Sequence, residues 1–356
     1  MKFITISFLA FFVFVTPSVG QIGGNSIFGF LDLPASARLA ALGGKMVPVR
    51  DNDLNLSFSN PSLLNRAVND QLTFNYSKYF ADIAYTNVAY ARKYKKHSMF
   101  SLGLNYLVYG SFDKADETGR ITGVFTGKEY AVQLSGSQQI DSFFTFGATV
   151  KFISSELETY RSYGLATDLG ISYYQPAQIF TATLLLRNLG RQLKSYYPGG
   201  ENEALPFEVE LGISKKLAHA PFHFHLVAQH LEKFDLTYDN PNDSSQPVDP
   251  ASESTSGTSK LQDFADKTLR HIIIGVEFVP SRNFFVDFSY NFQRGKEMQV
   301  ETKPGFVGFS WGVGMKINKF RFSFARSTYH IAGSTNHFSI STCPMEFIRF
   351  KRSNNS

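Results

Sequence analysis

The stretch FTFGATVKF, from Phe144 to Phe152, decides the fold, because apolar side chains stand at every second position and small or polar ones between them. A period of two residues is typical of a β-strand with one apolar and one polar face. The same alternation recurs at short intervals from Leu72 to Thr342 and gives about fourteen strands, each near the length needed to cross a bilayer at a tilt. The sequence therefore predicts an all-β chain.

The composition fits a β-rich chain with two unlike faces. Of 356 residues, 15% are aromatic, with 36 Phe and 17 Tyr, and only 18% are charged. The mean hydropathy is -0.14, and beyond residue 20 no stretch holds about twenty consecutive apolar residues, which excludes a helical membrane protein. The net charge of +5 comes without a basic stripe interleaved with aromatics, which argues against nucleic acid as a partner. A single cysteine, Cys343, excludes an intramolecular disulfide.

Residues 1–20 have the features of a secretory signal peptide. Lys2 supplies the positive charge, Phe3 to Val15 form an apolar segment, and Ser18 and Gly20 are the small residues before the cleavage site. No cysteine follows the predicted cleavage before Gln21, which argues against a lipoprotein. An exported chain without a helical span can cross a membrane only as a closed barrel.

The links between the predicted strands are segregated by length. Links that follow even-numbered strands are short: Lys93–Lys96, Gln139–Asp141, Gln175–Gln178, Leu217–Ala220, Pro280–Arg282 and Asn318–Lys319. All long links follow odd-numbered strands: Gly110–Lys128, Gly190–Leu205, Phe234–Leu269 and Gln293–Phe306. The other odd links are intermediate in length: Lys78–Asp82, Ser155–Ser162 and Tyr329–Ser334. A soluble sandwich has no reason for this pattern, whereas membrane barrels combine short periplasmic turns with long extracellular loops.

We therefore expect an antiparallel transmembrane β-barrel of about fourteen strands in the bacterial outer membrane, with its long loops extracellular and both termini periplasmic. The barrel should occupy residues 69–343 and leave a C-terminal tail at 344–356. Within the longest link, Asp239 to Lys260 is rich in Asp, Ser, Pro and Thr and is expected to be disordered. Leu261 to Leu269 is expected to form a short helix against the rim.

One segment ahead of the strands differs from the rest: PASARLAALGGKMVPVRDNDLNLSFSNPSLLN, Pro34 to Asn65. The alanines and leucines up to Leu42 favour a helix, with Pro34 suited to its first turn and Gly43-Gly44 to its end. A polar run and an Asn-Pro turn follow. Such a segment, placed before a long β-array, is expected to sit inside or beneath it.

A possible catalytic motif lacks the context that its chemistry needs. Gly308-Phe309-Ser310-Trp311-Gly312 matches the G-x-S-x-G pattern of serine hydrolases, in which a sharp strand-to-helix turn exposes the serine. Here the pattern lies in an alternating strand and no paired histidine and acid is evident. We interpret Ser310 as a small residue of the barrel wall and expect no catalytic residue.

Two possible metal sites are similarly incomplete. His223 and His225 share one strand face near His219 and His230, but no cysteine or carboxylate cluster joins them at ligand spacing. We interpret them as polar residues that face the lumen. Asp51-Asn52-Asp53 resembles the start of a calcium loop but lacks its glycine and bidentate glutamate. We therefore expect neither a metal nor a cofactor.

The N-terminal segment also resembles a family signature. Its residues Ala37-Arg38, Ala41-Leu42-Gly43-Gly44, Asp53 and Asn60-Pro61-Ser62-Leu63 resemble the start of FadL-like outer-membrane barrels, including the PorV group of the type IX secretion system. PorQ-like proteins of that system are more similar, through Gly23-Gly24-Asn25, Phe30 to Pro34, Arg50 to Asp53, Asp116 to Gly119, Arg187 to Arg191, Leu205 to Glu208, Gly212 to Leu217, His219 to Phe222, Gln229 to Lys233 and Leu236 to Tyr238.

The resemblance implies a function without catalysis. PorQ-like proteins anchor a surface protein, PorZ, beside PorV and the sortase-like PorU, where secreted cargo is joined to anionic lipopolysaccharide. The family signature also implies that residues 21–68 form a plug that enters the lumen. Arg38, Asp51, Asp53 and Asn60 would then contact the polar inner wall and close the pore.

Two other functions stay open on the sequence alone. The shared N-terminal signature and the aromatic content fit a FadL-like transporter of hydrophobic molecules. An outer-membrane hydrolase would need Ser310 as its nucleophile. A docking protein is the interpretation that best unites the long loops with the PorQ-like runs.

Overall fold

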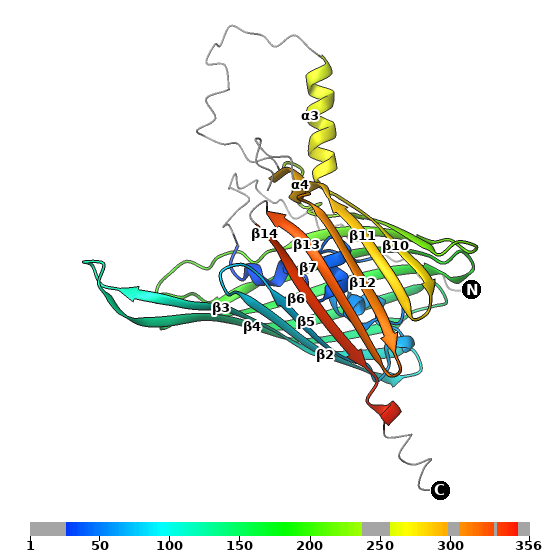
Figure 1. Ribbon diagram of the computed structural model, residues 1–356, viewed down its shortest axis with the longest axis horizontal. Helices are drawn as coiled ribbons and strands as arrows, with labels where there is room; N and C mark the ends of the chain where they lie inside the picture. Colours follow the sequence, from blue (N-terminus) through cyan, green and yellow to red (C-terminus); the bar gives the residue numbers. More distant parts are fainter. Residues whose placement is uncertain (1–25, 237–256, 298–305, 331–332, 348–356) are drawn as a thin grey trace, which may run out of the picture.

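The computed structural model describes residues 26–236, 257–297, 306–330 and 333–347. Strands make up most of these residues (Figure 1). Their bounds are β1 Leu72–Lys78, β2 Ala84–Lys95, β3 Ser98–Ala115, β4 Ile121–Gln139, β5 Phe144–Leu157, β6 Tyr160–Gln175, β7 Phe180–Lys194, β8 Glu208–Lys216, β9 Phe222–Ala228, β10 Ile272–Ser281, β11 Phe284–Asn291, β12 Phe309–Ile317, β13 Phe320–His330 and β14 Gly333–Thr342.

The strands close into one antiparallel barrel. Each strand pairs with its neighbours in sequence, and β1 also pairs with β14, from Leu72 opposite Thr342 to Lys78 opposite Asn336. Closure leaves no unpaired edge within the sheet, so the backbone hydrogen bonds are satisfied in a bilayer. The predicted all-β barrel of about fourteen antiparallel strands is confirmed.

No helix in the described ranges is long and apolar enough to cross a membrane.

The two faces of the barrel differ in polarity. Outward positions carry large exposed apolar side chains on every strand: Phe74, Val88, Leu102, Leu134, Val150, Leu165, Leu184, Leu211, Phe224, Ile274, Phe288, Trp311, Phe322 and Phe338. Inward positions of the same strands carry buried polar ones: Thr73, Asn87, Ser101, Gln133, Thr149, Asp168, Thr183, Glu210, His225, Glu277, Ser289, Ser310, Ser323 and Ser339. An apolar exterior around a polar interior is the arrangement of a barrel that spans a membrane.

The barrel has a turn end and a loop end. At the turn end the six links that follow even strands are short: 96–97, 140–143, 176–179, 217–221, 282–283 and 318–319. The loop end carries α3 (Gly257–Arg270), which projects away from the barrel, and α4 (Phe292–Glu297) (Figure 1). The predicted helix at Leu261 to Leu269 lies within α3, whereas most of the predicted disordered insert falls outside the described residues. Which end faces the periplasm stays a prediction.

The predicted long link from Gly110 to Lys128 is wrong. Strands β3 and β4 continue through it as one hairpin that extends beyond the other strands, and only residues 116–120 connect them (Figure 1). Phe112 and Phe125 stack across this hairpin with ring centroids 5.4 Å apart. Asp116 caps the turn through the backbone amides of Thr118 and Arg120. Such cross-strand side-chain pairs stabilise the pairing of β3 with β4 beyond the barrel wall.

The N-terminal segment lies inside the barrel as a series of short helical turns: η1 Gly29–Asp32, α1 Ala37–Ala41, α2 Leu54–Ser59, η2 Pro61–Leu63 and η3 Arg66–Val68 (Figure 1). We call residues 26–68 the plug. The predicted helix is shorter than expected, because Ser36 rather than Pro34 caps it by accepting the Leu39 amide. Asp53 begins α2, a helix that the sequence analysis missed, by accepting the Asn55 amide.

The described part of the C-terminal tail folds back onto the turn end. Phe347 contacts the ring of Phe320 at 5.7 Å, and Lys319 donates to the backbone carbonyl of Glu346. The tail therefore covers the turn between β12 and β13.

Candidate functional site

Small side chains bring α1 against the inner wall. Ala37, Ala40 and Ala41 form a buried cluster with Ala325 of β13. Gly312 of β12 leaves room for this contact, since a Cβ there would lie 2.6 Å from the Cβ of Ala41. Three wall serines fix the helix: Ser339 accepts the Ala37 amide, and Ser327 and Ser289 donate to the carbonyls of Ala40 and Ala41. The backbone of α1 is therefore bonded directly to three strands.

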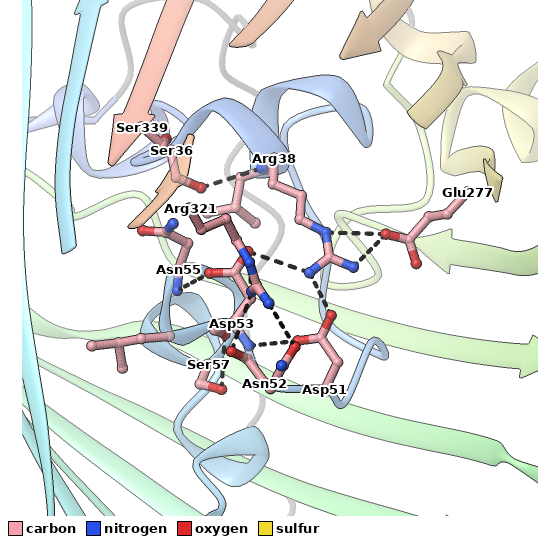
Figure 2. Close-up of polar contacts among 12 residues, drawn as sticks. Ser36, Arg38, Asp51, Asn52, Asp53, Asn55, Ser57, Glu277, Arg321 and Ser339 are labelled. Atoms are coloured by element: carbon pink, nitrogen blue, oxygen red, sulfur yellow. Dashed lines mark hydrogen bonds and ion pairs between the residues drawn. The ribbon is translucent and has the colours of Figure 1, made fainter. Parts of the chain in front are cut away.

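Arg38 joins the plug to the wall through a buried cluster of charges (Figure 2). Its Nε and Nη2 donate to one oxygen of Glu277 on β10, at 3.1 and 2.5 Å. Its Nη1 contacts Asp51 and lies 3.3 Å from Asp53. The guanidinium also lies 4.8 Å from the ring centre of Phe285. Arg38 is only 5% exposed, so these contacts are made out of water.

The carboxylates around Arg38 keep it charged. Burial alone would favour the neutral guanidinium, but Asp51, Glu277 and Asp53 raise its pKa well above the usual value. Two of these carboxylates make a further contact each. His223 Nδ1 lies 2.8 Å from Glu277, and Asp51 accepts the Asp53 amide at 2.8 Å. The cluster thus links two helical turns of the plug to β9 and β10.

One acidic residue beside this cluster has no hydrogen bond. Asp287 of β11 lies opposite Glu277 of β10 in the sheet and is fully buried. Neither of its carboxylate oxygens has a hydrogen-bond partner among the described residues. A buried carboxyl without a hydrogen bond is costly.

Asn60 serves mainly inside the plug. Its Nδ2 donates to the carbonyl of Val47 at 2.8 Å, and its Oδ1 accepts from the amide and hydroxyl of Ser62. Its nearest approach to the wall is at Gly170 of β6, where a Cβ would lie 2.7 Å from Oδ1. Of the four residues predicted for the plug–wall contact, Arg38 pairs with Glu277 of the wall, and Asp53 lies 3.9 Å from Arg321 of β13. Asp51 pairs with Arg38 inside the plug, and Asn60 orders the turn that packs on the wall.

A second buried charge cluster was missed by the sequence analysis. Lys45 of the plug pairs with Glu208 on β8, and Arg187 on β7 pairs with Glu210 at 2.9 Å. Nearby, Lys151 of β5 lies 2.7 Å from Asp168 of β6. For the charged residues of the wall the signal was present, because they stand at inward positions of alternating strands. Nothing local shows which of them meet.

An apolar track crosses the inner wall where polar residues are usual. The inward residues Tyr85, Leu107, Ala131, Ile153 and Ala166 come from five successive strands, β2 to β6, and form one buried cluster. The start of the plug covers this track with Ile27, Phe28, Phe30 and Leu31. Gly164 of β6 admits the aromatic ring of Phe28, since a Cβ there would lie 2.5 Å from it.

Three of the residues considered for chemistry, His223, His225 and Ser310, lie on the inner wall. His223 contacts Glu277, while His225 is buried without a hydrogen-bond partner among the described residues. The hydroxyl of Ser310 is likewise buried and unpartnered in that part of the chain. Within the described ranges no group of three or more His, Cys, Asp or Glu side chains is arranged to hold a metal ion.

These features define a membrane-spanning β-barrel of the outer-membrane type whose lumen holds its own N-terminal segment. No protein-family model and no curated protein matches the sequence.

Several solved outer-membrane barrels are similar in structure. The Pseudomonas putida toluene transporter TodX has a TM-score of 0.49 and 12% identity, with 87% of this chain and 96% of that one covered. The Ralstonia pickettii toluene transporter TbuX has a TM-score of 0.49 and 10% identity, with 88% and 98% covered. A Pseudomonas aeruginosa FadL homologue has a TM-score of 0.42 and 10% identity, with 87% and 97% covered. Likeness at this level is too low to carry a function to this chain.

Proposed function

We propose that the protein is an outer-membrane barrel that admits small hydrophobic molecules and is closed at rest by its plug. The observation that supports this most directly is the apolar track from Tyr85 to Ala166 on the inner wall. The interior of a membrane barrel is ordinarily polar. A hydrophobic solute gains free energy by contact with an apolar strip across five strands, whereas water does not.

The plug covers the track by contacts that can be exchanged. Phe28 and Phe30 pack on it without a covalent link. A hydrophobic solute that replaced these rings would bury similar apolar area, at about 25 cal/mol per Å². Exchange of the rings for a solute therefore changes the free energy little. We infer that the plug can be displaced reversibly by a solute.

Uptake of N-phenylnaphthylamine, a small apolar fluorophore, tests this function in cells that express the barrel. Replacing Leu107 and Ile153 with Asn makes the track polar, so uptake should fall at least fivefold while the barrel still assembles. Ser101→Asn is the matched control, because Ser101 is also a buried inward residue of β3 but lies outside the track. Equal uptake by the track variant and the wild type would contradict the proposal.

A second candidate function is supported by the elements that project at the loop end. We infer that this end could anchor a PorZ-like surface protein of a type IX secretion system, together with PorU and PorV, near lipopolysaccharide. In the described part of α3, Phe264 is 57% exposed, and its ring lies 5.9 Å from that of the exposed Phe234. Asp266 pairs with Arg270 within α3 and with Lys296 of α4, which joins the two helices at the loop end.

Deletion of residues 195–204 or 237–268 tests this second function. Either deletion, or both together, should release a PorZ-like partner from the barrel during affinity purification from native outer membranes. Barrel assembly should be unchanged in both. Fluorophore uptake should be unchanged in the deletion of residues 237–268, which removes no residue of the track or of its cover, whereas the deletion of residues 195–204 removes Tyr196, which packs against the track. Retention of the partner by both deletions would count against an anchoring role, whatever the uptake assay shows.

A further inference from the structure

We propose that a basic cavity at the turn end binds phosphate-class oxyanions. The cavity has a volume of about 340 Å³ and lies between the plug and the first turns of the barrel. The plug contributes Arg50 and Arg66, and the link between β2 and β3 contributes Lys96 and His97. This site is separate from the apolar track and from the Arg38 cluster.

The charge of the cavity is one-sided. Three permanent cations, Arg50, Arg66 and Lys96, line it, and no Asp or Glu is among its lining residues. None of the three makes an ion pair within the described part of the chain. Arg50 instead packs on Tyr174, with the guanidinium 4.8 Å from the ring centre. Cations held together without counter-charges repel each other, and a bound anion removes that cost.

The cavity floor also carries a spare hydrogen-bond donor. Thr145 of β5 lines the cavity, is only 2% exposed, and its hydroxyl has no hydrogen-bond partner among the described residues. The neighbouring Ser137 is already used, because its hydroxyl donates to the carbonyl of Leu64. Burying a hydroxyl without a partner is unfavourable. A ligand oxygen that accepts from Thr145 would satisfy it.

The donor set favours phosphate over other anions. Guanidinium groups donate in a fork that matches two oxygens of a carboxylate or a phosphate, and an ammonium adds a mobile third donor. Phosphate carries a further oxygen for that third donor and more negative charge than a carboxylate, so three cations favour it. The volume exceeds that of inorganic phosphate alone, so a phosphate monoester with a small polar body also fits. Met99, Ser137 and Thr145 are buried residues that face the lumen, so the inner part of the cavity lies on the lumen side of the wall.

Binding would also join the plug to the barrel. Arg50 and Arg66 belong to the plug, whereas Lys96, His97 and Thr145 belong to the barrel. A ligand that needs both groups binds only while the plug is seated, so it stabilises that state by mass action.

Calorimetric titration of the purified full chain in detergent tests the site, with inorganic phosphate, glycerol 3-phosphate and acetate as probes. Phosphate and glycerol 3-phosphate should bind saturably, and acetate at least tenfold more weakly. Arg66→Gln with Lys96→Gln should weaken phosphate binding at least tenfold, and Thr145→Val at least threefold. Lys93→Gln with Lys95→Gln is the matched control, because it removes two charges from the same hairpin outside the cavity and should change binding less than twofold.

Two further arms complete the test. The first arm measures binding of glycerol 3-phosphate in phosphatidylcholine nanodiscs with and without phosphatidic acid. Undiminished binding identifies a soluble ligand, whereas weaker binding in the presence of phosphatidic acid identifies a lipid phosphate as the ligand. Either result supports the oxyanion site. The proposal is overturned if the wild type shows no saturable binding, if acetate binds as tightly as phosphate, or if the control pair weakens binding as much as the cavity pair. Should the double variant not fold, Lys96→Gln alone, with Thr145→Ser as the variant that retains the hydroxyl, decides the question in the same way.

Discussion

At the scale of single residues, Arg38 is the central cation of the charge cluster that links the plug to β10. It compensates Asp51, Asp53 and Glu277 at once, and Asp287 lies nearby without a hydrogen bond. A buried ion pair stabilises little compared with an apolar pair, but removal of one partner leaves the others uncompensated. Within this cluster the plug is therefore held to β10 through one arginine.

Replacing Arg38 with Met should lower the free energy of unfolding by about 3–5 kcal/mol, because the buried carboxylates of Glu277 and Asp53 would lose their closest cation. Urea-induced unfolding in lipid vesicles measures the change. Arg282→Met serves as the control, because Arg282 is exposed on the turn between β10 and β11. A loss of similar size in both variants would show that the cluster adds nothing specific.

Asp32 should make stability depend on pH. Burial raises the pKa of its carboxyl above the ordinary 3.8, although nearby Lys45 opposes the shift and Glu208 adds to it. The folded state therefore binds its proton more tightly than the unfolded state. Its contribution to stability is present at low pH and is lost as the pH rises through the raised pKa.

The variant Asp32→Asn keeps the size of the side chain and removes the ionisation. Its free energy of unfolding relative to the wild type should therefore increase over the pH range that begins near the ordinary carboxyl pKa of 3.8 and extends upward. Parallel urea titrations at several pH values give the difference. A difference that stays constant across this range, or shrinks, would contradict the raised pKa.

At the scale of elements, close backbone contacts decide how the plug sits. The turn at Asn60-Pro61-Ser62 packs on β5 and β6 where glycines remove the side chain. At Gly147 of β5 a Cβ would lie 2.2 Å from the carbonyl carbon of Pro61 and 2.3 Å from the amide nitrogen of Ser62. Neither backbone atom can yield without moving the whole turn.

Gly147→Ala should therefore displace η2 from the wall and cost about 1–3 kcal/mol of stability, as overpacking of a core does. Limited proteolysis should cut the plug faster than in the wild type. Gly123→Ala is the control, because nothing lies within 4 Å of a Cβ at that position in the β3–β4 hairpin. Unchanged proteolysis in Gly147→Ala would show that the turn is not held at this contact.

At the scale of the whole molecule, the barrel and the plug share their interior contacts. Four buried hydrophobic clusters join plug residues to wall residues, and two charge clusters do the same with polar groups. The plug therefore accounts for much of what the inner wall buries. We expect it both to close the pore and to stabilise the barrel.

Deleting residues 26–65 should open the pore and lower the barrel's resistance to unfolding. Single-channel recording in planar bilayers should show conductance that the intact protein lacks. Deletion of residues 111–125, which shortens the β3–β4 hairpin outside the barrel, should leave the pore closed. If the plug deletion neither gains conductance nor loses stability, the closing role assigned to Arg38 and its partners is wrong.

The amino-acid sequence by itself determined the barrel, its approximate strand number and the polarity of its two faces, because the alternation that creates them is local to each strand. Link lengths also separated the two ends, although the strands of the β3–β4 hairpin were mistaken for a loop. Only the tertiary structure decided which inward residues meet. Arg38 and Glu277 stand 239 positions apart, and their contact depends on the register in which fourteen strands close around the plug. A one-residue slip would turn Glu277 to the lipid face, so no local pattern can encode the pair.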